Sequence, residues 1–145
     1  DDNGTFIMKW GTEGEADGQL SKPESSIVDS MGNVYIADYG NDRIQKFTND
    51  GKFIKAWGSK GSADGQFRGP SGLSIDANDN IYVTDKNNNR IQIFTNDGQF
   101  ISKFGVSGAG DGQFSGPEGV GVDKETGTVY VADTGNTRIQ VFKPL

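Results

Sequence analysis

The sequence contains no cysteine and no histidine. Without cysteine the chain forms neither disulfides nor thiolate metal sites. Cysteine usage therefore does not indicate whether the protein works in an oxidising or a reducing compartment. Without histidine it has no imidazole general base, no Ser-His-Asp triad and no histidine-zinc centre. The two absences therefore exclude the commonest constellations of hydrolases and zinc enzymes.

Long hydrophobic runs and helical periodicity are also missing. Hydrophobic residues make up 32% of the chain, and no apolar run approaches the roughly 20 residues that a membrane-spanning helix needs. No segment repeats its apolar residues with the period of about 3.6 that an amphipathic helix shows. We therefore expect an all-β protein without a membrane partner.

Positive charge is scarce as well. The chain has 14 lysines and arginines against 20 aspartates and glutamates, which gives a net charge of −6. A chain of this charge is repelled by phosphate backbones rather than drawn to them. We therefore do not expect nucleic acid as a partner, although Lys60, Arg68 and Lys86 are placed to form a local basic patch.

What the sequence does have is an internal repeat. The pattern of residues 33–47 returns at 80–94 and at 128–142, at spacings of 47 and then 48 residues. Each copy has an aspartate and, five positions later, an arginine. The corresponding residues are Asp38, Asp85 and Asp133, and Arg43, Arg90 and Arg138. A fixed period of 20 to 50 residues is typical of repeat architectures.

Each repeat contains short runs in which apolar and polar residues alternate, as in β-strands. In the first repeat these runs are residues 23–29, 34–37, 44–47 and 53–57. The Asn-Asp-Gly sequence at 49–51 supplies the positive φ that a hairpin turn needs. Four strands in a unit of this length, without a helix, predict a β-propeller blade.

The repeats also share motifs in a fixed order. These are Pro-x-Gly-Leu-x-Ile-Asp, Ile-Tyr-Val-x-Asp, Asn-x-Arg-Ile-Gln-x-Phe and Asp-Gly-x-Phe-Ile, with the bridging sequence Gly-x-x-Gly-x-x-Asp-Gly-Gln-Phe at 58–67. Over the whole chain they closely resemble the NHL repeat. This resemblance implies a propeller, usually of six blades. It does not imply one activity, because a fold hosts many functions.

We predict a single domain over residues 1–145 with three blades, two of them complete and one split between the two ends of the chain. Residues 1–10 form the fourth strand of a split blade, 11–57 the first complete blade, 58–104 the second, and 105–145 the first three strands of the split blade. Three blades are fewer than the roughly four to eight that close a ring. We therefore predict a homodimer that forms one six-bladed ring by strand exchange. The residues expected at this closure are Phe6, Met8, Trp10, Arg138, Ile139 and Phe142.

Several repeated residues invite a functional interpretation but are better explained structurally. The repeated aspartates and arginines could bind a ligand, yet a specific site is seldom repeated in every unit, whereas a structural bond is. We expect each arginine to pack and bond toward a neighbouring blade. Each Asp-Gly-Gln turn supplies one carboxylate, and a calcium loop needs several. The tyrosines at 35, 82 and 130 are expected in the core, with Leu20, Phe67 and Phe114 as plugs between blades.

A pair of serines departs from the repeat. Ser25 and Ser26 stand where later repeats have Gly-Leu and Gly-Val. A hydroxyl at an inward-facing position needs a hydrogen-bond partner. We expect it to bond to the neighbouring backbone; the alternative is a polar group that lines a central channel.

We predict a non-enzymatic module that binds a protein or peptide, or acts as a scaffold, without a cofactor or metal. Recognition is expected on the face where the loops of the repeats diverge. The residues of this face are Glu13, Glu15, Lys22, Tyr39, Lys60, Arg68, Lys86, Val106 and Thr134.

Two alternatives follow from the resemblance. One is a metal-dependent propeller enzyme, similar to lactonases or lyases, with its site in the central channel. The lyases would require histidine ligands that this chain lacks, and the acids that differ between blades, Glu13, Glu15, Glu24 and Glu118, make no convincing dyad. The other alternative is an RNA-binding NHL domain, which would require a basic face.

Overall fold

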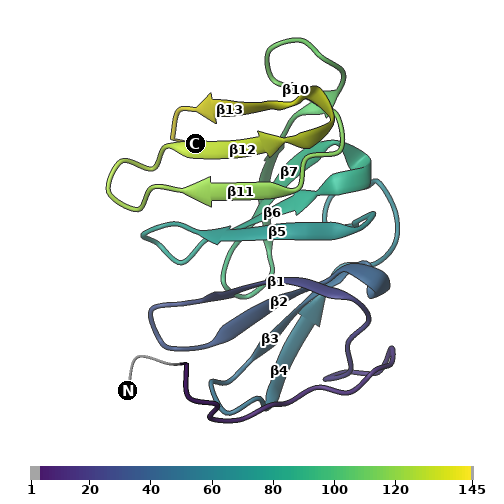
Figure 1. Ribbon diagram of the computed structural model, residues 1–145, viewed down its shortest axis with the longest axis vertical. Helices are drawn as coiled ribbons and strands as arrows, with labels where there is room; N and C mark the ends of the chain where they lie inside the picture. The colour runs from purple at the N-terminus through teal and green to yellow at the C-terminus, as the bar shows by residue number, and fades with distance from the viewer. Residues whose placement is uncertain (1–3, 145) are drawn as a thin grey trace.

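The computed structural model describes residues 4–144, which fold into three antiparallel sheets placed side by side (Figure 1). Two sheets have four strands, which neighbour one another in chain order. Blade 1 consists of β1 (Pro23–Val28), β2 (Val34–Asp38), β3 (Arg43–Phe47) and β4 (Phe53–Trp57). Blade 2 consists of β5 (Pro70–Ile75), β6 (Ile81–Asp85), β7 (Arg90–Phe94) and β8 (Phe100–Phe104).

The third sheet, the split blade, has three strands in the part of the chain that the structure describes. These are β11 (Gly119–Val122), β12 (Val129–Asp133) and β13 (Arg138–Phe142). β13 forms one edge of this sheet, whereas the corresponding β3 and β7 pair with a fourth strand. The all-β prediction is confirmed, and among residues 4–144 of this chain no fourth strand pairs with the split blade.

Short 3-10 helices join the second strand of each sheet to the third. They are η1 (Tyr39–Asn41), η2 (Lys86–Asn88) and η3 (Thr134–Asn136). Each is followed by a left-handed residue: Asp42, Asn89 or Thr137. The sequence predicted only a tight loop here. Within residues 4–144, no helix has the length and apolar character needed to cross a membrane.

The long connections between sheets are held closed by parallel pairing. In the third connection, β9 (Val106–Ser107) pairs with β10 (Gln113–Phe114). The first two connections contain single parallel bridges at the equivalent places, Glu13 with Leu20 and Lys60 with Phe67. Each connection therefore returns on itself at the same end of the sheets as the 3-10 loops.

The hydrophobic core lies between the sheets rather than within any one of them. Between blades 1 and 2, Tyr35 and Ile44 are buried in the same cluster as Phe67, Leu73 and Phe94. A second cluster between blade 2 and the split blade contains Tyr82, Ile91, Phe114, Val129 and Val131. Phe67 and Phe114 thus plug the junctions as predicted. Burial of this kind requires each blade to have a neighbour on both faces.

The N-terminal segment differs from its prediction. Residues 5–10 form no strand in the single chain, because a fourth strand must pair with a third strand, and the unpaired one, β13, lies at the opposite end of the molecule (Figure 1). Trp10 nevertheless packs on Phe47, with ring centroids 6.5 Å apart. Trp57, at the end of β4, lies 6.0 Å from Phe94 in the next blade.

Candidate binding face

The repeated aspartate is the centre of a hydrogen-bond network at the loop end of each sheet. In blade 1, the buried carboxylate of Asp38 accepts hydrogen bonds from Arg43 Nε at 2.8 Å and Asn41 Nδ2 at 2.9 Å. It also accepts them from Gln45 Nε2 at 3.0 Å and the backbone N–H of Ser21 at 2.7 Å. Its oxygens are therefore engaged, and none is left to face a ligand.

The repeated arginine joins this network to the long connection. Arg43 donates from Nη2 to the carbonyl oxygens of Ala16 and Gln19 at 2.9 and 2.8 Å. Arg90 and Arg138 do the same in their own repeats. The structural interpretation is confirmed, with one correction. The guanidinium bonds within its own repeat and not to a neighbouring blade, because the connection folds back over it.

Hydrogen bonds shift the acidity of one of these aspartates. Burial by itself would raise the pKa of Asp133, but hydrogen bonds from the Ser115 N–H, Asn136, Arg138 and Gln140 hold that pKa below its usual value. The group is therefore a charged anchor of the fold.

The residues predicted to form the binding face are at the loop end of the sheets. Seven are exposed: Glu13, Glu15, Lys22, Lys60, Arg68, Val106 and Thr134; Tyr39 and Lys86 are half-buried. They do not form one site. Tyr39, Lys60 and Arg68 line a common cleft at the junction of blades 1 and 2, whereas Glu15 and Lys60 share a second hollow beside it.

The cleft between blades 1 and 2, which we call the junction cleft, has a defined floor. Gly69 lies beneath the ring of Tyr39, and a Cβ at this position would be 2.6 Å from the ring carbon Cε2. The backbone N–H of Gly69 donates to Asp42 Oδ1 at 2.7 Å. Asn87 completes the lining. Sequence analysis missed Asp42 and Asn87, although both occupy loop positions at which the repeats differ.

Lys86 has a different environment, at the inner end of blade 2. Its Nζ is 2.6 Å from Glu118 Oε1. This hydrogen bond to Glu118 raises the pKa of Lys86. Both residues line a hollow that also contains Glu24 and Ser71. Within residues 4–144 no group of three or more acidic side chains is placed to hold a metal ion.

The family model of the NHL repeat matches residues 26–47, 67–94 and 114–142, which is more than half of the chain. The chain belongs to the NHL repeat family. Its sheets are accordingly NHL blades, with the 3-10 loops and connections on one face of the propeller fold.

Two curated proteins contain similar NHL sequences. Protein wech of Drosophila melanogaster is 44% identical over 43 residues, which are 30% of this chain and 5% of that protein. Protein lin-41 of Caenorhabditis elegans is 43% identical over 44 residues, which are 30% of this chain and 4% of that protein. The matched segments are thus small parts of both relatives.

Solved structures share the fold at low sequence identity. A protein of unknown function from Bacteroides thetaiotaomicron has a TM-score of 0.74 and 23% identity, over 89% of this chain and 37% of its own. A streptogramin B lyase has a TM-score of 0.63 and 20% identity, over 86% of this chain and 41% of its own. A Kuenenia stuttgartiensis hydrazine synthase has a TM-score of 0.67 and 15% identity, over 97% of this chain and 35% of its own. The NHL chain thus spans about two fifths of these chains or less.

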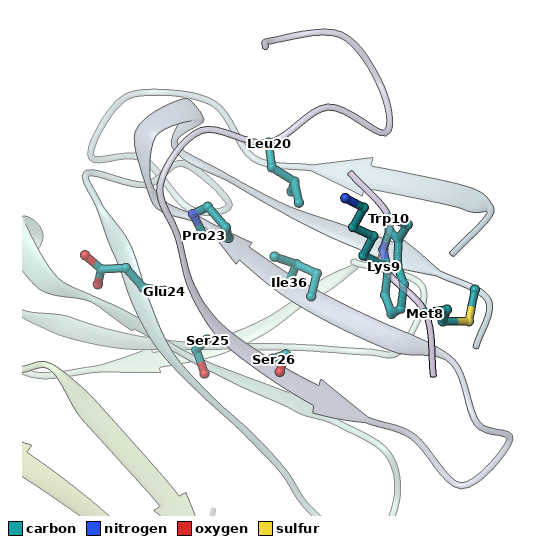
Figure 2. A pocket seen from close by; sticks show the side chains of 9 residues that line it. All are labelled: Met8, Lys9, Trp10, Leu20, Pro23, Glu24, Ser25, Ser26 and Ile36. Carbon is teal, nitrogen blue, oxygen red and sulfur yellow. The ribbon is translucent and has the colours of Figure 1, made fainter. Parts of the chain in front are cut away.

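The serine pair of the first NHL blade lies on the inner side. Ser25 Oγ accepts a hydrogen bond from the backbone N–H of Leu73 in the next blade, at 3.2 Å. This bond belongs to the serine at the glycine position and not to Ser26, the serine at the Leu/Val position for which it was expected. Ser26 is exposed and lines a hollow with Trp10, Leu20 and Ile36 (Figure 2). The hollow lies on the open face of blade 1.

The split NHL blade leaves the opposite face open. Tyr130 is 45% exposed and Ile139 is 63% exposed, whereas the equivalent Tyr35 and Ile44 of blade 1 are fully buried. The core position predicted for Tyr130 is therefore not reached in the single chain. The predicted closure residues also remain apart. Trp10, in the same N-terminal segment as Phe6 and Met8, packs on Phe47 of blade 1. Arg138, Ile139 and Phe142 belong to β13, at the opposite end of the molecule (Figure 1).

Proposed function

We propose that this chain is a protein-binding module, in which two copies close a six-bladed ring and present the loop face to a partner. The observation that carries the binding role is that repeated polar residues and variable exposed residues serve different purposes on this face. Polar residues that recur in every repeat, such as Asp38 and Arg43, are used in the internal network. Exposed residues on the same face, such as Lys60 and Val106, differ between repeats and are free for recognition.

The ring accounts for the two open faces of the chain. Tyr130 and Ile139 correspond to Tyr35 and Ile44, which form one half of the blade 1–2 core. The other half of that core includes Phe67, Leu73 and Phe94; at the open face of blade 1 the equivalent positions hold Leu20, Ser26 and Phe47. A second copy brings these halves together, once at each junction. Closed two-fold arrangements are the commonest oligomers.

The ladder of the complete blades sets the register of the exchanged strand. In blade 1, Ile44 pairs with Trp57, Lys46 with Lys55 and Phe47 with Phe53. Because β13 corresponds to β3 and the N-terminal segment corresponds to β4, we expect β13 to pair with the N-terminal segment of the second copy. The expected pairs are Ile139 with Trp10, Val141 with Met8, and Phe142 with Phe6. This pairing covers the open edge of β13, which would otherwise invite strand addition from other molecules.

A thiol label tests the binding role, because the chain has no cysteine of its own. Random peptides are selected on the immobilised protein by phage display. Their binding is then measured on two variants, Val106→Cys and Lys124→Cys, each carrying a polyethylene glycol maleimide. Val106 is on the loop face, and Lys124 is in the turn between β11 and β12, at the other end of the sheet.

We expect the label at position 106 to abolish binding of the selected peptides and the label at position 124 to leave it unchanged. No enrichment of peptides over the uncoated support would contradict the proposal. Equal loss of binding with both labels would contradict it as well.

A further inference from the structure

We propose that the junction cleft binds the side-chain carboxylate of an Asp or Glu residue in a partner peptide. This inference rests on the proposed binding role of the loop face and names the chemistry of its partner. The cleft is formed by Tyr39, Lys60, Arg68 and Asn87 above Gly69. It lies within one chain and does not need the ring to be closed.

The first argument is that these side chains are not required by the fold. Lys60 corresponds to Glu13 in the first repeat and Ser107 in the third. Arg68 corresponds to Ser21 and Ser115, and Tyr39 corresponds to Lys86 and Thr134. All three equivalent loops nevertheless have the same 3-10 conformation. The combination of an aromatic ring and two cations therefore occurs at this junction alone among the three repeats.

The second argument concerns hydrogen-bonding capacity. Tyr39, Lys60, Arg68 and Asn87 all present donors to the cleft. Among residues 4–144, the ammonium of Lys60 and the guanidinium of Arg68 have no carboxylate within 4.0 Å. The one acid in the lining, Asp42, already accepts the Gly69 N–H. Unoccupied donors around a single hollow fit an acceptor-only, anionic ligand.

The third argument separates a carboxylate from a polyanion. The loop face also carries Glu13 and Glu15, of which Glu15 shares the hollow beside the cleft with Lys60, and the net charge of the chain is −6. These charges oppose a strand of phosphates, which would have to cross them. A single carboxylate avoids them, and the planar fork of Arg68 matches it in two parallel hydrogen bonds. Glu13 and Glu15 also favour a peptide that is otherwise neutral or basic.

Nuclear magnetic resonance titration tests this site with defined probes. The probes are two capped pentapeptides of glycine and serine, one with a central glutamate and one with a central glutamine, and a hexauridylate RNA. The signals observed are the backbone amide of Gly69 and the side-chain Nε–H of Arg68. The titration is run at about 150 mM salt, which screens charges beyond about 8 Å.

We expect the glutamate peptide to bind at least about five-fold more tightly than the glutamine peptide, since a charged hydrogen bond is roughly twice as strong as a neutral one. The variant K60S/R68S places the residues of the third repeat at both positions and should reduce this preference to less than about two-fold. The variant K52S/K124S removes the same charge from turns at the opposite end and should keep the preference in full.

Equal binding of the two peptides would overturn the carboxylate site, and so would a preference that survives in K60S/R68S. Tighter binding of hexauridylate at the same signals would overturn it in favour of RNA. Failure here is distinguishable from failure of the binding role. Peptides from phage display that still bind the loop face, while the glutamate peptide does not, would refute the carboxylate site alone.

Discussion

Trp10 and Phe47 are related in the same way as Trp57 and Phe94. The ring planes are inclined by 51° in the first pair and by 50° in the second. Trp57 ends the fourth strand of one blade and packs on the next. Trp10 therefore packs on blade 1 as Trp57, in the fourth strand of blade 1, packs on blade 2. This relationship is the structural basis of the proposed ring.

Replacing Phe6 by alanine should weaken the association of two copies. Phe53 and Phe100, at the equivalent position, pack edge-on against Phe47 and Phe94, with ring centroids 6.1 and 6.0 Å apart. In the ring, we expect Phe6 of one copy to make the same contact with Phe142 of the other. We expect the dissociation constant to rise about ten-fold, measured by sedimentation. Ile7→Ala is the matched control, and a change as large as that of Phe6→Ala would contradict the predicted register.

Ile7 is the right control because its equivalents stay exposed in complete blades. Ile54 is 44% exposed and Ile101 is 48% exposed. A side chain that faces solvent in the closed ring contributes little to closure, so its removal should leave the dissociation constant within about two-fold.

Removing the repeated aspartate should destabilise the fold strongly. Asp85 is fully buried, and its carboxylate accepts a hydrogen bond from Arg90 Nε at 2.7 Å. Asp85→Ala leaves a guanidinium that is only 8% exposed without its partner. We expect a loss of about 3–5 kcal/mol in the free energy of unfolding, measured by urea titration at a fixed protein concentration.

The exposed pair of Asp64 and Lys103 provides the comparison. Asp64 is 51% exposed and Lys103 is 46% exposed, so the pair is well solvated. Asp64→Ala should cost at most about 1 kcal/mol. Similar costs for Asp64→Ala and Asp85→Ala would show that the buried network is not the anchor described here.

Acid should destabilise the chain partly through Asp133. Hydrogen bonds place its folded pKa below the usual 3.8, against the effect of burial. A carboxyl with a lowered folded pKa stabilises the fold above its unfolded pKa, and this contribution is lost as the pH falls toward the folded pKa. Asp133→Asn should therefore lose less stability than the unaltered chain between about pH 6 and about pH 3. Parallel losses in the two proteins would contradict this assignment.

Much of the fold follows from the repeat itself. The predicted strand at 34–37 is found as β2, Val34–Asp38, and the predicted strand at 53–57 is found as β4. Periodicity could also assign Asp38 and Arg43 to structure, because a bond required by every blade must recur in every blade. Local pattern and internal comparison are therefore sufficient for the sheets and their network.

The remaining features depend on contacts that the sequence does not encode locally. Residues 5–10 have the pattern of a strand, but a strand exists only where an edge is available to pair with it. Tyr39, Lys60 and Arg68 were each predicted on the binding face, but their convergence on one cleft depends on how blades 1 and 2 are placed. The 3-10 loops were missed because their Gly and Asn residues also fit ordinary turns.

The mass of the 145-residue chain in solution tests the central claim most directly. Light scattering at micromolar concentration should give twice the chain mass of 15.5 kDa, which is about 31 kDa. A stable, soluble species of 15.5 kDa, or a mass that is not an even multiple of it, would contradict the two-chain ring.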